Sequence, residues 1–333
     1  MMLVAVAGAS GRVGRRLLSY LKSKGIRAVA LVRSRASIAR LPKNTPYKLV
    51  HFDTGWGLAD ALKNATHVVN LTGSVDTSLS QKELYDANVV PTSHLLSAAP
   101  RSIKRFVHVS SIAVYPKHPR GPVDENHHRA PADPYGRTKL EGERIALMHA
   151  QRLPITILEP AIIYGPGFAS GFHAVLERLV KGEMAVIGKG DNRFPLIHVN
   201  DVVSAIHQAL LSDVPSGSVF IVASAQPLTQ KEALTLAADA LGVPAPRSHV
   251  PASVAKLGAV FSTLKARIRG RERALSTDMV EQICADRVFN PECARRILGW
   301  SARVGHAKGI RQAVQAFMKT KRPKIIRKKA RRH

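Results

Sequence analysis

Short apolar runs alternate with amphipathic segments along the first half of the chain. Residues 3–7 form a continuous apolar run that ends at Gly8, which is typical of a strand buried in a parallel sheet. Residues 12–24 carry apolar side chains at helical spacing, and Gly25 ends this segment. The alternation predicts an α/β fold with a doubly wound parallel sheet. Further strands are expected at 26–32, up to 53, at 67–71 and at 105–109, and further helices at 58–63 and 81–99.

A glycine-rich segment joins the first strand to the first helix. Gly8 permits a tight turn, Gly11 lets the backbone approach a pyrophosphate, and Gly14 lets the helix pack closely on the strand. The amides at the start of the helix then face the phosphates. A strand, a glycine turn and a helix in this order predict a dinucleotide-binding site.

The basic residues near the second strand bear on which dinucleotide binds. Residues 1–52 contain 11 Lys or Arg and no Asp or Glu, so no acid follows the second strand to hydrogen-bond the ribose of NAD. Arg33 follows that strand, and Arg12 and Arg35 are further candidates for a 2′-phosphate. NADP is therefore the expected cofactor, with NAD as the alternative. A generally basic surface is the other interpretation of these arginines.

Three polar side chains after the predicted nucleotide turn suggest hydride-transfer chemistry. Ser111 follows the strand at 105–109, and ligands bind at such carboxyl ends. Lys139 lies one helical turn after Tyr135, so its ammonium is expected to lower the phenol pKa from about 10. Tyr135 would exchange a proton with a carbonyl or alcohol oxygen that Ser111 holds. The spacing of Tyr135 and Lys139 alone is weak evidence for such a site. Their position after a serine-bearing strand in a nucleotide domain makes the evidence strong.

Together these segments resemble the extended short-chain dehydrogenase/reductases, in the group of NAD-dependent epimerases and dehydratases. The resemblance covers residue 3 to about residue 317. It rests on motifs that occur in the family's order along the chain: Gly8 to Gly14, Asp53, Asn88-Val89, Ser110 to Tyr115, Pro134 to Lys139, Glu159 to Pro166 and Ile197 to Asp201.

This resemblance implies roles for individual residues. Asn88 is expected to join Ser111, Tyr135 and Lys139 as a catalytic residue, and Asp53 to lie near the adenine. The residues expected to bind the cofactor are Gly8, Ser10, Gly11, Arg12, Val13, Gly14, Arg33, Asp53, Thr72, Gly73, Tyr135, Lys139 and Pro160.

A two-part organisation is also implied by the resemblance. It consists of a Rossmann-like cofactor domain and a smaller C-terminal α/β substrate-binding region, and it includes a homodimer formed through helices of the first domain. The cofactor domain is expected at 1–165 with 196–225, the substrate-binding region at 166–195 and 226–318, and the dimer helices at 81–99 and 135–151.

Departures from the family pattern narrow the expected function. Ile112-Ala113 follows Ser111 where dehydratases of the family carry an acidic pair, which argues against water elimination. Glu159 stands where many members have an arginine, and Phe194 where nucleotide-sugar enzymes commonly place one. The main hypothesis is a carbonyl reductase or alcohol dehydrogenase for an apolar substrate. The alternatives are a nucleotide-sugar epimerase and a non-catalytic cofactor-binding subunit at a membrane or polyanion.

Positive charge is unusually high, with a formal net charge of +27. Residues 319–333 contribute nine Lys or Arg and no acid, a composition expected to stay unfolded by itself. Residues 254–269 combine an apolar face with basic side chains, so they predict either an interfacial helix on anionic lipid or a helix packed on the core. Only 5% of residues are aromatic and no aromatic-rich motif accompanies the charge, which argues against a nucleic-acid partner.

Cysteine and histidine usage favours a cytoplasmic enzyme without a metal. Cys284 and Cys293 are too few for a disulfide framework, and His127-His128 lacks a third metal ligand nearby. No stretch approaches the roughly 20 apolar residues that span a bilayer. Thr229 and Glu232 have the spacing of a capping box at a helix start.

Overall fold

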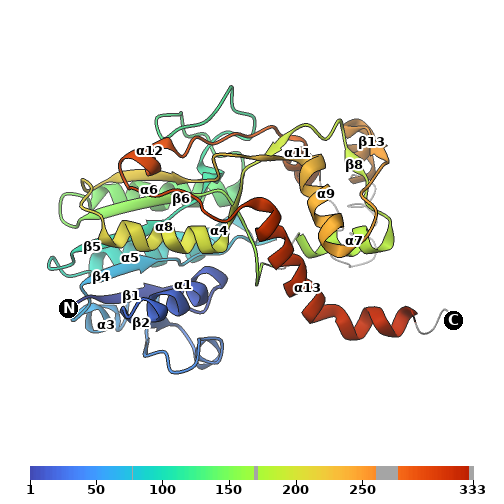
Figure 1. The fold of residues 1–333 in the computed structure, drawn as a ribbon. Helices are drawn as coiled ribbons and strands as arrows, with labels where there is room; N and C mark the ends of the chain where they lie inside the picture. Colours follow the sequence, from blue (N-terminus) through green and yellow to red (C-terminus); the bar gives the residue numbers. More distant parts are fainter. Residues whose placement is uncertain (77, 169–171, 260–276, 330–333) are drawn as a thin grey trace. The chain divides into compact units, whose positions relative to one another are not determined.

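The computed structural model describes residues 1–76, 78–168, 172–259 and 277–329, which form two compact units (Figure 1). The first unit comprises Met1–Ile162, Val199–Ala225 and Phe289–Arg303. The second comprises the described residues of Ile163–His198, Gln226–Val288 and Val304–His333.

A parallel sheet of seven strands forms the centre of the first unit (Figure 1). Strand order reverses between β1 and β4, and ligands bind at the carboxyl ends of the strands at such a point. This confirms the predicted doubly wound, Rossmann-like fold. From one edge to the other the strands are β3 (Tyr47–Leu49), β2 (Arg27–Val32), β1 (Leu3–Ala7), β4 (His67–Asn70), β5 (Arg105–Val109), β6 (Ile155–Pro160) and β11 (Ser218–Val222).

Helices cover this sheet in two groups, because successive side chains of a buried strand point to opposite faces. Ala5 and Ala7 of β1 join Phe106 of β5 and Leu95 of a neighbouring helix in one apolar cluster. One group of helices consists of α1 (Arg12–Ser23) and α8 (Val199–Leu211), which pack on each other. The other consists of α3 (Leu58–Leu62), α4 (Gln81–Asn88), α5 (Val90–Ala98) and α6 (Pro134–Met148).

Two elements of this unit differ from the sequence prediction. The helix expected at 81–99 is divided into α4 and α5, because Pro91 has no amide hydrogen to continue the hydrogen-bond ladder of α4. The third strand ends at Leu49 instead of Asp53. Residues 52–54 form a turn closed by the Gly55 amide, which donates to the His51 carbonyl at 2.8 Å.

The C-terminal segment of the first unit was expected in the substrate-binding region. It contains the short helix α12 (Glu292–Arg296), which contacts β11. The indole of Trp300, 5% exposed, donates to the Ser204 hydroxyl on α8 at 2.8 Å. Burial of this indole against α8 explains why Phe289–Arg303 belongs to the cofactor unit.

The second unit is a smaller α/β assembly of helices packed around an apolar cluster, with several pairs of short strands. Its cluster includes Leu176, Ala238, Val314 and Phe317. Thr229 and Glu232 form the predicted capping box of α9. The elements are α7 (Phe172–Lys181), α9 (Gln230–Leu241), α11 (Thr277–Cys284), α13 (His306–Lys329), β7 (Ile162–Tyr164), β10 (Leu196–His198), β9 (Arg193–Phe194), β12 (Leu228–Thr229), β8 (Val186–Ile187) and β13 (His249–Val250).

Helix α13 continues to Lys329, whereas the composition of residues 319–333 predicted a segment without structure. The packed first half of α13 supplies the costly first turns, and Lys and Arg then propagate a helix readily. Of the predicted segment 254–269, residues 260–269 lie outside the described part. Val254 and Leu257 are 56% and 58% exposed, whereas Ala255 and Ala259 are buried in a small apolar cluster with Val280. The described part of this segment therefore packs one face on the core and exposes two apolar side chains. No helix among the described residues is long and apolar enough to span a membrane.

Candidate active site

Glycines shape the backbone on both sides of the point where the strand order reverses. Gly8 has a φ of +74°, and the Gly11 amide donates to the Gly8 carbonyl at 3.0 Å. A Cβ on Gly14 would collide with the backbone of this turn. Gly73, just beyond β4, has a φ of +137°. Gly11 caps α1 without a side-chain hydrogen bond, and no acid lies in the first turn. Helix amides thus remain available to an anion.

The other predicted cofactor residues lie on the segments that leave the carboxyl ends of the strands. Arg33 is exposed directly after β2, and Arg12 begins α1. Thr72 is fixed after β4, because its hydroxyl donates to Asn70 Oδ1 at 2.6 Å. Ser10 and Val13 lie between the glycines of the segment Gly8 to Gly14, Pro160 ends β6, and Asp53 is exposed in the turn after β3.

Ser111, Tyr135 and Lys139 come together at the carboxyl end of β5. The hydroxyl groups of Ser111 and Tyr135 are hydrogen-bonded to each other. The Ala113 amide donates to Ser111 Oγ at 3.2 Å, which fixes the serine at the start of a short 3-10 turn (Ile112–Val114). Asp133 caps α6 by accepting from the Gly136 amide at 2.7 Å. This cap holds the helix turn that carries Tyr135.

The protonation of this group differs from the sequence expectation. Burial, opposed by the hydrogen bond to Ser111 and assisted by the Asp133 carboxylate, raises the pKa of Tyr135 to about 12. The expected lowering by Lys139 is absent, and the Lys139 ammonium donates instead to the Val109 carbonyl at 2.7 Å. Burial lowers the pKa of Lys139 to about 8, against the opposing charge of Glu143. Tyr135 is therefore a proton donor at neutral pH.

Asn88, the fourth predicted catalytic residue, is 1% exposed and ties three segments together. Its Oδ1 accepts from the Ser74 amide at 2.7 Å, and its Nδ2 donates to Thr138 Oγ1 at 2.8 Å. The amide therefore joins α4 to α6 and to the loop after β4. These contacts show a positioning role, and a catalytic role of Asn88 stays a prediction.

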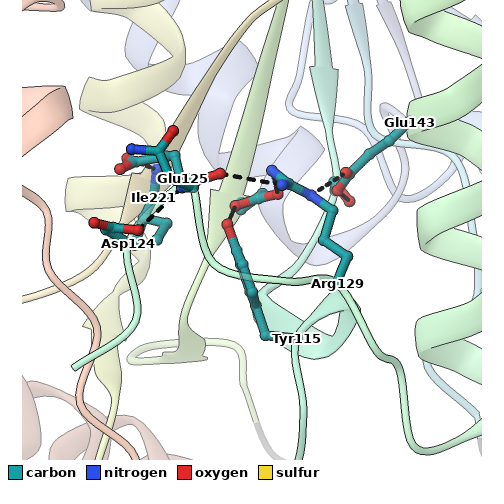
Figure 2. A network of polar contacts seen from close by, with 9 residues as sticks. Tyr115, Asp124, Glu125, Arg129, Glu143 and Ile221 are labelled. Carbon is teal, nitrogen blue, oxygen red and sulfur yellow. Dashed lines mark hydrogen bonds and ion pairs between the residues drawn. The ribbon is translucent and has the colours of Figure 1, made fainter. Parts of the chain in front are cut away.

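A buried charged cluster beside these residues was not predicted (Figure 2). It consists of Tyr115, Arg129, Glu143 and Glu159. The Tyr115 hydroxyl donates to Glu159 Oε2 at 2.7 Å, and Arg129 Nη2 donates to Glu159 Oε1 at 3.1 Å. Arg129 Nε lies 3.5 Å from Glu143 Oε2. Burial raises the pKa of Glu143, and it raises that of Glu159 to about 8 with help from the Glu143 charge.

Two members of this cluster left a signal in the sequence. Glu159 is a charged residue at the end of a mostly apolar strand, and Glu143 follows Lys139 by one helical turn. Arg129 lies in an irregular loop, where no periodicity indicates the direction of a side chain. Among the described residues, no three His, Cys, Asp or Glu side chains gather as a metal site requires.

A glycine turn on a doubly wound sheet, with Ser111, Tyr135 and Lys139 at its carboxyl edge, defines an extended short-chain dehydrogenase/reductase. Residues 4–223 match the NAD dependent epimerase/dehydratase family, and the chain belongs to this family.

Comparison with known proteins gives relatives that act on ketones and on sugars. The chain is 26% identical over 326 residues to a 4-hydroxy-2-methyl-3-oxo-4-farnesyl-3,4-dihydroquinoline-1-oxide ketoreductase of Stigmatella aurantiaca, covering 95% of this chain and 96% of the relative. It is 26% identical over 239 residues to an N-acetyl-alpha-D-glucosaminyl-diphospho-ditrans,octacis-undecaprenol 4-epimerase of Escherichia coli O157:H7, covering 70% and 72%. The solved structure of MoeE5 in complex with UDP-glucuronic acid and NAD has a TM-score of 0.75 at 24% identity, covering 95% of this chain and 99% of that one.

Proposed function

We propose that the chain is an NADP-preferring reductase that converts an apolar ketone to an alcohol, and the alcohol to the ketone in reverse. The main support for this proposal is the hydrogen bond between the hydroxyls of Ser111 and Tyr135. The Lys139 ammonium lies near them, where it donates to the Val109 carbonyl. When bound, the nicotinamide cofactor supplies or accepts the hydride. Ser111 and Tyr135 then hold the substrate oxygen, and Tyr135 gives it a proton.

The protonation of the site favours the reductive direction. A phenol with a pKa of about 12 keeps its proton at neutral pH and can donate it to an oxygen that gains negative charge. Oxidation requires the phenolate instead. The positive charge of an oxidised nicotinamide favours that anion, so the reverse reaction becomes faster as pH rises.

The cofactor site fits a phosphate-bearing dinucleotide. The uncapped N-terminus of α1 offers backbone amides, and the glycine turn leaves no side chain in the way. Arg33 is exposed after β2, without an acid at that position, which supports NADP as the preferred cofactor.

Arg193 gives the reason for preferring an apolar ketone to a nucleotide sugar. Arg193 directly precedes Phe194 in the sequence. At the position of Phe194, nucleotide-sugar enzymes commonly have an arginine that binds the diphosphate. The Arg193 guanidinium forms a two-pronged ion pair with Asp286, at 2.9 Å to Oδ1 and 2.6 Å to Oδ2. A diphosphate would have to displace this carboxylate. The ketoreductase relative also matches the chain over nearly its whole length.

Epimerisation of a nucleotide sugar or of a lipid-linked sugar is the second candidate, because the Escherichia coli relative is named for such a reaction. The two candidates differ in the fate of the cofactor. A reductase oxidises NADPH in proportion to product, whereas an epimerase returns the hydride and leaves the cofactor unchanged. A third candidate, a cofactor-binding subunit without turnover, is disfavoured by the intact Ser111, Tyr135 and Lys139.

Purified protein incubated with NADPH and a panel of aliphatic, polycyclic and aromatic ketones tests the proposal. We expect NADPH oxidation with at least one class, faster than with NADH. UDP-sugars and a lipid-linked sugar, analysed for epimers, form the comparison arm. Epimer formation without net cofactor oxidation, or no turnover in either arm, would contradict the reductase.

The proposal also includes two contacts of the protein surface, a homodimer interface and a contact with an anionic membrane. A homodimer through α4, α5 and α6 is supported by Tyr85, Leu147 and Met148, which are 46%, 43% and 80% exposed on α4 and α6. Contact with an anionic membrane is supported by the exposed Val254 and Leu257 and by the basic residues 319–333. Light scattering tests the dimer, and a single-chain mass would contradict it.

A further inference from the structure

The charged cluster of Tyr115, Arg129, Glu143 and Glu159 adjoins the reacting groups from three elements of the first unit. Glu143 lies on α6, Glu159 on β6, and Arg129 on the loop before α6. The side chains of Glu143 and Glu159 are 2% and 0% exposed. Figure 2 shows the guanidinium of Arg129 close to the carboxyl group of Glu143.

Burying two carboxyl groups side by side is costly unless positive charge or a shared proton compensates. Arg129 contacts both carboxyl groups, and a proton held by Glu159, whose pKa is raised to about 8, removes one of the two negative charges. Arg129 faces both groups, and its guanidinium carbon lies 5.2 Å from the Tyr115 ring centre. Its Nη1 also donates to the Glu125 carbonyl at 3.1 Å. The planar fork of arginine suits these simultaneous contacts.

Glu143 connects this cluster to the site of reaction. The Ser110 hydroxyl donates to Glu143 Oε1, and Ser110 precedes Ser111. Glu143 also follows Lys139 by one turn of α6, and its charge acts on the ammonium. The groups that face Glu143 are thus Ser110, Lys139, Arg129 and Glu159. Those that face Glu159 are Tyr115, Arg129 and Glu143.

We propose that Glu143 is a positioning residue that keeps the buried Lys139 protonated and holds Ser110 beside the reacting serine, with Arg129 stabilising its negative charge. This rests on the proposed function only in assigning Lys139 to the cofactor and the reaction. A buried ammonium without an anion nearby loses its proton at a lower pH. Arg129 matters because, without it, Glu143 and Glu159 would both tend to take up protons, and the anion beside Lys139 would be lost.

The pH dependence of cofactor binding tests this without any carbonyl substrate. NADPH affinity of the full chain, measured by nucleotide fluorescence from neutral to alkaline pH, should fall with a midpoint near the pKa of Lys139, about 8. Lys139→Met should abolish that midpoint, which would assign it to the titration of Lys139. Glu143→Gln should lower the midpoint by about one pH unit, which is about a tenfold loss of protonated lysine above it. The matched control is Glu141→Gln, on the same helix and 40% exposed.

A second pair of variants covers the case in which Glu143→Gln does not fold. Arg129→Met should also lower the midpoint, and Arg129→Lys should restore it in part because it keeps the charge. Arg144→Met, at a 66% exposed position on α6, should leave it unchanged.

Two results would overturn the proposal. One is that Lys139→Met leaves the pH midpoint of NADPH affinity of the wild type in place, or that the wild type shows no such midpoint. The other is that a folded Glu143→Gln or Arg129→Met variant keeps the wild-type midpoint. Loss of carbonyl turnover alone would contradict the reductase and leave this result standing.

Discussion

Tyr135 holds its proton in this structure, and the reason lies in the groups around it. Burial and the Asp133 carboxylate raise its pKa to about 12, and the Lys139 ammonium is engaged by the Val109 carbonyl at 2.7 Å. Ser111 is left as the direct hydrogen-bond partner of the phenol. A carbonyl oxygen placed between these two hydroxyls would therefore meet two donors, as reduction requires.

Replacing Tyr135 with phenylalanine removes the proton donor and keeps the ring. We expect NADPH-dependent ketone reduction to fall by at least about a hundredfold, the lower end of the usual contribution of general acid catalysis. Cofactor affinity, measured by nucleotide fluorescence, should stay within about threefold, since the ring still fills its position. Tyr47→Phe, at a 47% exposed position on β3, is the matched control. Unchanged turnover in Tyr135→Phe would remove this residue from the mechanism.

Arg33→Ser tests the preference for the phosphorylated cofactor. Loss of a charge-assisted contact to a 2′-phosphate should weaken NADP binding by about tenfold or more and leave NAD binding nearly unchanged. Calorimetric titration of both nucleotides measures this, with the exposed Arg40→Ser as a control for the general effect of one positive charge. Equal losses for both nucleotides would identify Arg33 as part of a basic surface only.

At the scale of elements, the N-terminus of α6 positions the reacting tyrosine. Asp133→Ala removes the bond from the Gly136 amide, 2.7 Å long, and should lower the free energy of unfolding by about 1 kcal/mol. Asp133→Asn keeps a capping oxygen and should retain most of that stability. Urea unfolding measures both. Equal stability of the Ala and Asn variants would show that the cap does not hold the helix.

The strand β6 carries a carboxyl group that makes stability depend on pH. Burial and the Glu143 charge raise the pKa of Glu159 to about 8, from a usual value of 4.5. The folded state then binds more protons than the unfolded state between these values, so stability is highest at the acidic end of this window and falls as pH rises toward about 8. The slope from one such group is at most about 1.4 kcal/mol per pH unit.

Glu159→Gln should remove this contribution, so its unfolding free energy should change less between these two pH values than that of wild type. Urea unfolding across the window measures the difference, and Glu141→Gln on the surface of α6 is the control. A variant with the wild-type pH dependence would mean that Glu159 is ionised in the folded protein.

Periodicity predicted the first elements well because they are regular and fully buried. The strands at 3–7 and 105–109 have the predicted bounds, since apolar runs ending in a turn leave little choice of register. Pro91 was a visible signal for the break between α4 and α5, but buried positions at helical spacing continue across it, from Leu84 and Asn88 to Thr92 and Leu95. The turn at 52–54 depends on backbone bonds to His51, which no side-chain pattern encodes.

The meeting of Ser111, Tyr135 and Lys139 was predictable because each lies at a fixed offset from a strand end or a helix start. Their protonation was not, because the pKa of Tyr135 depends on the direction of the Lys139 ammonium and on burial. Arg129 was also beyond prediction, since its loop is irregular and its partners are 14 and 30 residues away in sequence.

For the whole molecule, the excess of positive charge is the property that most affects association. Removing residues 319–333 takes away nine positive charges and lowers the net charge from +27 to +18. Each Lys or Arg near an anionic surface contributes about 1 kcal/mol, and salt screens this attraction.

Truncation after Met318 should therefore weaken binding to vesicles containing phosphatidylserine, and added salt should weaken the binding of the full chain. Co-sedimentation measures this, with neutral phosphatidylcholine vesicles as the control. Binding of the full chain that does not depend on lipid charge or salt would contradict a membrane role for these residues.

Transfer of deuterium from NADPH labelled at its transferable hydrogen is the most direct test of the central claim. With a ketone that the protein turns over, mass spectrometry of the alcohol should show one deuterium per cofactor oxidised, and Tyr135→Phe should reduce this transfer by at least about a hundredfold. An unlabelled product, or equal transfer by the Tyr135→Phe variant, would contradict reduction at the Ser111 and Tyr135 site.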